Sequence, residues 1–180
     1  MIFDTHAHYD DEAFDGDREE LLGSLQNQGI KAVTNVAASL KSCETTLALA
    51  ENYNFIYGAI GVHPSETAEL DENGMERLEH WCGCKKIRAV GEIGLDYYWE
   101  EPDHEIQKKW FVRQLDLARR SRLPVIIHSR GCGQGYSGYH ESRGGGRDRR
   151  SDPLFFLHKG DGQRVSEYGL LSGDRRRPDL

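Results

Sequence analysis

The sequence has no excess of basic charge, few cysteines and no long apolar run. Its 180 residues carry 23 Lys and Arg against 30 Asp and Glu, a formal net charge of −7, so the overall charge does not attract nucleic acid. The four cysteines lack the pattern of a disulfide scaffold. No run approaches the roughly 18 apolar residues of a membrane span, and residues 1–8 lack the regions of a signal peptide. We therefore expect a soluble cytoplasmic protein with no membrane partner.

The composition changes after Arg130. Residues 1–130 carry 14 Lys and Arg against 23 Asp and Glu, whereas residues 131–180 carry 9 against 7 and contain 11 of the 20 glycines. A segment with so little apolar surface cannot offset the entropy lost on ordering. We divide the chain into a folded part, residues 1–130, and an atypical Gly/Arg-rich tail, residues 131–180. Two interpretations of the tail are disorder and translation in a shifted reading frame.

Short apolar runs alternate with amphipathic segments up to Arg130. The pattern predicts strands at 2–3, 32–36, 55–60, 87–90 and 125–127, and helices near 17–28, after an N-cap at Ser42, around 75–81 and over 104–122. Strands separated by helices pair in parallel, and their apolar runs indicate that both faces are covered. An open doubly wound sheet and a barrel both fit this pattern.

Histidines and acids follow four of the five expected strands. They are His6 and His8, His63, Glu92, and His128. In a barrel of alternating strands and helices, the C-terminal ends of the strands converge on one mouth, where the chemistry is located. This placement favours an α/β fold of the TIM-barrel (β/α)8 type. Because such a barrel needs roughly 250 residues, we expect an incomplete one of about five βα units followed by the irregular tail.

The same residues suggest a metal site. His6 and His8 are two apart, so their rings share one face of an extended segment. Glu92 would be the carboxylate ligand, and His128 occupies the same strand-end position. Neutral imidazoles with a carboxylate bind divalent metals. Each residue alone has an ordinary alternative as a core or surface side chain, but the repeated position favours a hydrolytic metal centre.

Other residues near the expected mouth allow two interpretations each. Asp4 either orients a ligand histidine or bonds to the backbone. His63 either contacts phosphate and moves a proton or simply packs. Arg130 suits a phosphate as well as a salt bridge. The aromatic residues at 97–99 either stack on bases or cover the rim of the barrel.

Four segments together resemble the TatD-type metal-dependent deoxyribonucleases: residues 4–8 (DTHAH), 61–64 (GVHP), 91–98 (GEIGLDYY) and 124–130 (PVIIHSR). The resemblance covers residues 1–130 and implies an amidohydrolase-like TIM barrel that hydrolyses DNA with one or two Mg²⁺, Mn²⁺ or Zn²⁺ ions. It makes His6, His8, Glu92 and His128 the metal ligands. We expect Glu92, His63 and Arg130 to act in catalysis, the last two by orienting phosphate.

One part of the family pattern is missing. The family also has a histidine after its sixth strand and an aspartate, the expected general base, after its eighth, and nothing after Arg130 matches either segment. His140 and His158 are present, but their surroundings do not resemble the family. Two alternatives therefore stay open beside DNA hydrolysis: a truncated, non-catalytic metal-binding remnant, and a related hydrolase of small esters or amides. Metal identity and oligomeric state are also open.

Overall fold

A computed structural model describes residues 2–131 and 156–159. The strands are β1 (Ile2–Ala7), β2 (Ile30–Val36), β3 (Ile56–Ile60), β4 (Ile87–Asp96), β5 (Val125–Arg130) and β6 (Phe156–Lys159). The helices are α1 (Arg18–Leu25), α2 (Leu40–Asn52), α3 (Glu72–Cys82) and α4 (His104–Ser121). Two short 3-10 helices, Glu12–Phe14 and Pro64–Glu69, follow β1 and β3. Strand and helix therefore alternate along the chain, as predicted.

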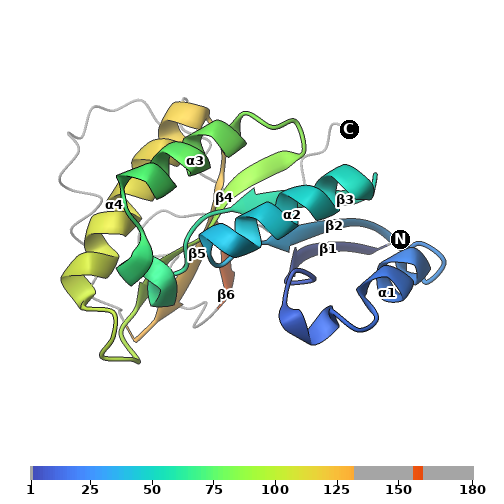
Figure 1. The fold of residues 1–180 in the computed structure, drawn as a ribbon, viewed down its shortest axis with the longest axis horizontal. Coiled ribbons are helices and arrows are strands. Elements are labelled where there is room, and N and C mark those ends of the chain that lie inside the picture. Colours follow the sequence, from blue (N-terminus) through green and yellow to red (C-terminus); the bar gives the residue numbers. More distant parts are fainter. Residues whose placement is uncertain (1, 132–155, 160–180) are drawn as a thin grey trace, which may run out of the picture.

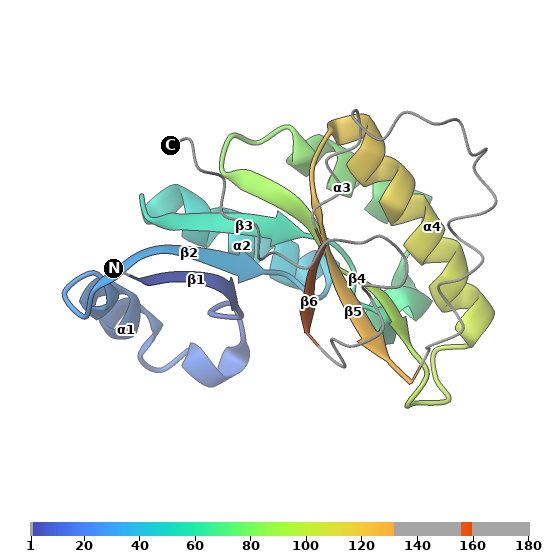
Figure 2. The ribbon, with the colours of Figure 1, turned by 180° about the vertical axis from the view of Figure 1, so that it is seen from behind.

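The strands form one parallel sheet in the order β1-β2-β3-β4-β5-β6. Helices α2, α3 and α4 lie on one face of this sheet (Figure 1), and in the view from behind α2 is partly hidden by β2 and β3 (Figure 2). A doubly wound sheet reverses its strand order at a switch point and carries helices on both faces. The sequential order instead produces the curled wall of a barrel, so the barrel alternative is the correct one.

Helix α4 packs its apolar stripe against the sheet. Trp110, Phe111 and Leu117 are buried there. Ile106 has a similar helical spacing but is 39% exposed, whereas its neighbour Gln107 is buried. Gln107 takes the buried position because its side-chain amide hydrogen-bonds to the backbone N–H and carbonyl of Asp96. None of the helices among residues 2–131 is long and apolar enough to span a membrane.

Helix α2 begins earlier than predicted. Its N-cap is Ser39, not Ser42, and the Ser39 hydroxyl accepts the backbone N–H of Ser42 at 3.1 Å. The Ser42 hydroxyl accepts the backbone N–H of Ser39 at 3.1 Å. The two serines form a reciprocal capping box that satisfies two otherwise unpaired donors. Ser42 therefore contributes to the cap from inside the helix.

Strand β4 is longer than predicted and contains Glu92 instead of ending before it. The expected strand stopped at Val90 because Gly91 and Gly94 are typical of loops. Ile93 and Leu95 are buried, however, and pairing with β5 continues to Asp96, which lies opposite Arg130. Glu92 lies between Val90 and Ile93, which both pair with β5, and its backbone N–H donates to the carbonyl oxygen of Ala37 at 2.9 Å.

We predict that Leu117→Ala lowers the free energy of unfolding by about 2–5 kcal/mol, because it leaves a cavity between α4 and the sheet. Urea unfolding followed by circular dichroism measures the change. Ile106→Ala, on the exposed side of the same helix, is the matched control and should cost much less. Equal losses in the two variants would mean that the buried face of α4 is wrongly assigned.

Candidate metal centre

The C-terminal ends of four parallel strands bring the predicted ligands together. His6 lies near the end of β1 and His8 directly follows it. Glu92 projects from β4, His128 from β5, and His63 follows β3. Because parallel strands end at the same edge of a sheet, residues separated by more than a hundred positions share one site. The sequence-based placement of these five residues therefore corresponds to a real cluster.

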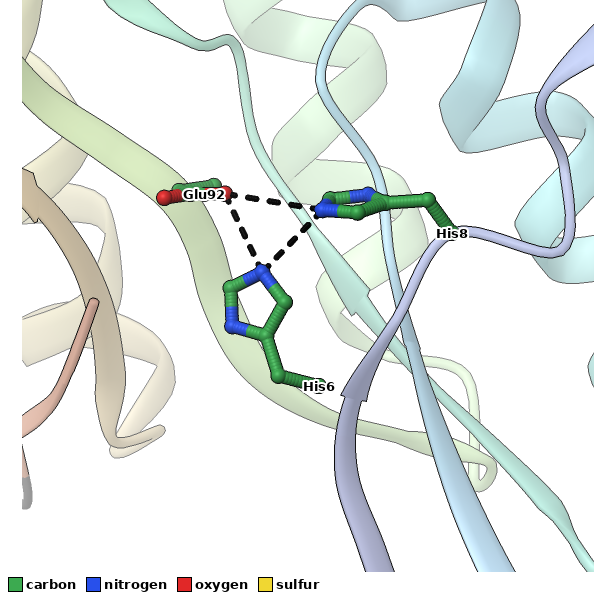
Figure 3. A group of neighbouring side chains, drawn as sticks. All are labelled: His6, His8 and Glu92. Atoms are coloured by element: carbon green, nitrogen blue, oxygen red, sulfur yellow. Dashed lines mark hydrogen bonds and ion pairs between the residues drawn. The ribbon is translucent and has the colours of Figure 1, made fainter.

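Glu92 lies at the centre of this cluster. One oxygen, Oε2, is 3.2 Å from His6 Nε2 and 3.9 Å from His8 Nε2 (Figure 3). The other oxygen, Oε1, is 3.2 Å from His128 Nδ1. The Glu92 side chain is only 6% exposed. A carboxylate this deeply buried requires cations or hydrogen-bond donors around it, and the histidines occupy that position on both sides.

Two groups of potential metal ligands share Glu92. The first contains His6, His8 and Glu92, and the second contains His63, Glu92 and His128. Within each group the donor atoms lie within 4.8 Å of one another. The rings of His63 and His128 meet edge to face, with centroids 4.2 Å apart. Imidazole nitrogens and a carboxylate oxygen are suitable ligands for a divalent ion, so the residues of these two groups would be able to hold one or two such ions.

The pKa values in the cluster suit metal binding. Burial opposes ionisation of Glu92, but hydrogen bonds from His128 and His6 outweigh it and hold the pKa of Glu92 well below its usual range. Burial, reinforced by repulsion from His128, lowers the pKa of His63 to about 4. At neutral pH, Glu92 is therefore ionised and His63 neutral, the forms that a metal ion needs.

His128 differs because it contacts two acids. Burial alone would lower its pKa, but hydrogen bonds to Glu92 and Asp96, together with their negative charge, raise the pKa of His128. Its second ring nitrogen, Nε2, lies 3.1 Å from Asp96 Oδ2. A metal ion binding at His128 must therefore displace any proton held on Nδ1.

Backbone contacts fix the orientation of the histidines. His8 Nδ1 lies 2.7 Å from the carbonyl oxygen of Val36, which leaves Nε2 facing Glu92. His63 Nδ1 accepts the backbone N–H of Ser65 at 3.2 Å, so its Nε2 remains for a ligand. Asp4 accepts the backbone N–H of His6 at 3.2 Å, which is the backbone alternative of the two left open for this acid.

Sequence reasoning missed three buried polar residues around the cluster. Asp96 binds His128, as described above. Gln107 Oε1 accepts the backbone N–H of Asp96 at 2.8 Å, and its Nε2 donates to the Asp96 carbonyl at 3.0 Å. Gln114 makes the same pair of bonds, 2.7 and 3.1 Å, to Val62, which directly precedes His63. Glu92 and Asp96 are four residues apart, so in one strand their side chains point to the same face, and this spacing could have placed Asp96 near the cluster. No local sequence pattern distinguishes the two glutamines.

Strands β4 and β5 approach closely at two glycines that flank Glu92. A Cβ atom on Gly94 would lie 2.0 Å from the carbonyl oxygen of His128, and Gly94 has a φ of +149°, which disfavours other residues. A Cβ atom on Gly91 would lie 2.6 Å from Ile126 Cβ. The absence of side chains at these positions allows His128 to come within reach of Glu92.

The remaining predicted residues lie at the rim. Arg130 is exposed at the end of β5, and its guanidinium carbon is 3.8 Å from the ring centroid of Tyr98. Tyr98 and Trp99 are 59% and 57% exposed, so they do not form the packed rim that was one of their two interpretations. The ring of Tyr97 instead stacks on His104, with centroids 3.9 Å apart.

The predicted tail falls mostly on residues 132–155 and 160–180, outside the described residues. His140 is among them. His158 lies in β6, where its backbone pairs with Ile127 of β5. This short strand overlaps the apolar run of the sequence at residues 154–157.

Imidazole and carboxylate ligands at the C-terminal edge of a sequentially ordered parallel sheet are the arrangement of barrel-type metal-dependent hydrolases. Within that class the sequence identifies the family. Residues 3–145 match the family described as TatD related DNase, and the chain belongs to it. The crystal structure of YjjV, a TatD homologue from Escherichia coli K12, aligns with a TM-score of 0.71 and 35% identity over 77% of this chain and 54% of that one. The predicted TIM-barrel type is thereby confirmed.

Curated relatives show the same similarity. YjjV, named an uncharacterized metal-dependent hydrolase, is 39% identical over 131 residues, covering 72% of this chain and 51% of the relative. YabD of Bacillus subtilis, with the same description, is 35% identical with the same coverage. The 3'-5' ssDNA/RNA exonuclease TatD of Cronobacter sakazakii is 30% identical over 72% of this chain and 49% of its own length. The chain spans about half the length of these relatives.

We predict that Glu92→Gln abolishes tight binding of a divalent metal, because it removes the one carboxylate common to both ligand groups. Metal content after dialysis against Mn²⁺ or Zn²⁺, measured by mass spectrometry, tests this. Glu76→Gln, an exposed position on α3, should retain the metal content of the unmodified chain. Full retention in Glu92→Gln would exclude this centre as the metal site.

We further predict that Asp96→Asn weakens metal binding about 10- to 100-fold, because the carboxylate that orients His128 and increases its basicity is lost. Competition with a chromogenic chelator measures the affinity. Asp17→Asn is the control, since Asp17 is exposed and makes no side-chain capping bond. If the two variants bind metal equally well, Asp96 does not support the centre.

Proposed function

We propose that this chain provides a metal-dependent centre that hydrolyses phosphodiester bonds of DNA. Its catalytic residues in this proposal are Glu92, His63 and Arg130, and its metal ligands are His6, His8, Glu92 and His128. The proposed cofactor is one or two divalent ions, Mg²⁺, Mn²⁺ or Zn²⁺, since nitrogen and carboxylate ligands serve all three.

The observation that carries the proposal is the position of Glu92 between two sets of histidines. A carboxylate that is 6% exposed, with one oxygen facing His6 and the other facing His128, is of little use to the fold unless a cation is bound there. Its low pKa keeps it ionised and ready to bind that cation. A purely structural role would be served equally well by an apolar residue.

Each residue has a defined task in the proposed reaction. Glu92 would supply the negative charge, and His6, His8 and His128 the imidazole nitrogens, that hold a divalent ion. Such an ion, when bound, would supply Lewis-acid chemistry for activating water and for stabilising charge on the phosphoryl oxygens. His63, with its pKa lowered to about 4, is neutral and able to accept a proton from water or to bind phosphate. Arg130, exposed at the rim, can present its planar fork to a phosphate.

The choice of DNA as substrate is supported by the relatives and by local charge. The Cronobacter sakazakii relative is named a 3'-5' ssDNA/RNA exonuclease. Residues 1–130 carry a net charge of −9 from 14 Lys and Arg against 23 Asp and Glu, so a nucleic acid must be held at the centre itself. Bound cations and Arg130 would supply the local positive charge.

The full chain should shorten a fluorescently labelled single-stranded oligodeoxynucleotide in the presence of Mg²⁺ or Mn²⁺. We expect EDTA to stop the reaction and Glu92→Gln to slow it by about 100-fold or more. Electrophoresis of the products measures both effects. Glu76→Gln should cleave at the rate of the unmodified chain.

Two small substrates decide between this function and its alternatives. Turnover of bis(p-nitrophenyl) phosphate or p-nitrophenyl acetate without cleavage of DNA would favour a hydrolase of small esters. Metal binding with no turnover of any substrate would favour a non-catalytic remnant.

A further inference from the structure

Two aromatic side chains stand exposed beside the metal centre. Among the described residues, the exposed large hydrophobic side chains are Ile2, Phe3, Tyr98, Trp99 and Ile106. Ile2 and Phe3 belong to β1, the edge strand of the sheet, which accounts for their exposure. Tyr98 and Trp99 instead follow β4, in the loop that leads to α4 beside the end of β5 (Figure 2). Adjacent exposed aromatic side chains of this kind mark binding sites.

This aromatic pair is held in a fixed arrangement. The rings of Tyr98 and Trp99 meet at 89°, with centroids 4.7 Å apart. The guanidinium group of Arg130 lies over the Tyr98 ring at 3.8 Å. The preceding backbone is fixed too, because the N–H of Tyr97 donates to the Arg130 carbonyl at 2.8 Å. A platform fixed before binding loses little conformational entropy when a ligand arrives.

The pair is linked directly to the metal ligands. The backbone N–H of Tyr98 donates to Asp96 Oδ1 at 3.0 Å, and the other oxygen of Asp96 lies 3.1 Å from His128 Nε2. One carboxylate thus connects the aromatic pair to the cluster. Glu92 and Asp96 belong to β4, and His128 and Arg130 belong to β5, so the aromatic pair lies at the same end of these strands as the cluster.

We propose that Tyr98 and Trp99 form a stacking platform for a nucleobase of a single-stranded nucleic acid whose phosphate is held at the metal centre. This inference rests on the proposed function and adds two residues, Tyr98 and Trp99, that would hold the nucleic acid beside the centre. In a duplex the faces of each base are covered by its neighbours, whereas an unstacked base offers a free face to an aromatic ring. Stacking is tolerant of base identity, so the platform selects for strandedness over sequence.

The test measures binding of a fluorescent single-stranded thymidine oligonucleotide with hydrolysis-resistant phosphorothioate linkages. Anisotropy is compared for the full chain and for Trp99→Ala, Trp99→Phe and Phe3→Ala. We expect Trp99→Ala to weaken binding about 5- to 150-fold and Trp99→Phe to retain most of the affinity. Phe3 has the same 57% exposure as Trp99 but lies at the start of β1, so Phe3→Ala should bind as the unmodified chain does.

An abasic oligonucleotide with the same number of phosphates isolates the contribution of the bases. The platform requires that the unmodified chain and Trp99→Ala bind this probe equally. The inference is wrong if Trp99→Ala loses the same affinity for both probes. It is also wrong if Trp99→Ala loses no affinity for the base-bearing probe. Metal-dependent cleavage of natural DNA is scored separately. Cleavage with unaltered binding by Trp99→Ala rejects the platform alone, and base-dependent binding without cleavage rejects the proposed function alone.

Discussion

The buried carboxylate of Glu92 is the constraint on which the rest of the structure depends. An ionised acid with 6% of its side chain exposed is costly unless positive charge or donors surround it. In this sheet the surroundings come from three other strands: β1 supplies His6, the segment after β3 supplies His63, and β5 supplies His128. None of these residues can satisfy Glu92 unless the strands are parallel and their ends coincide. The parallel strand order is therefore what allows the histidines to surround the buried charge of Glu92.

Around this centre, polar groups of helix α4 hold the strand ends in place. Gln107 and Gln114 are both fully buried, a position that amides occupy only when their hydrogen bonds are satisfied. Each clamps both backbone groups of one residue, Asp96 on β4 or Val62 after β3. Helix α4 thus does more than cover the sheet with apolar side chains. It also sets the position from which His63 and Asp96 project.

The alternation of strands and helices, the barrel type of the fold and the identity of the clustered residues could all be predicted from the sequence. Those signals are local: an apolar run, a helical spacing, and a histidine or acid directly after the run. The errors also have local causes. Gly91 and Gly94 are typical of loops, which hid the second half of β4, and either Ser39 or Ser42 is an acceptable N-cap. The hydrogen bonds of Gln107 and Gln114 to the backbone could not be predicted, because they join residues 11 and 52 positions apart. The sequence around a glutamine in a helix does not indicate which backbone groups its side chain will bind.

The glycine at position 94 has a consequence for protein engineering. Its missing side chain lets the backbone of β5 pass close to β4, and the reach of His128 toward Glu92 follows from that spacing. Copying the four histidines and the glutamate onto another parallel sheet would therefore transfer the side chains without the strand spacing that brings His128 to Glu92. The recipient scaffold would also need two neighbouring strands that approach each other closely beside its glutamate. The close spacing of the two strand backbones must therefore be reproduced first, because these side chains come together only where the strands approach in this way.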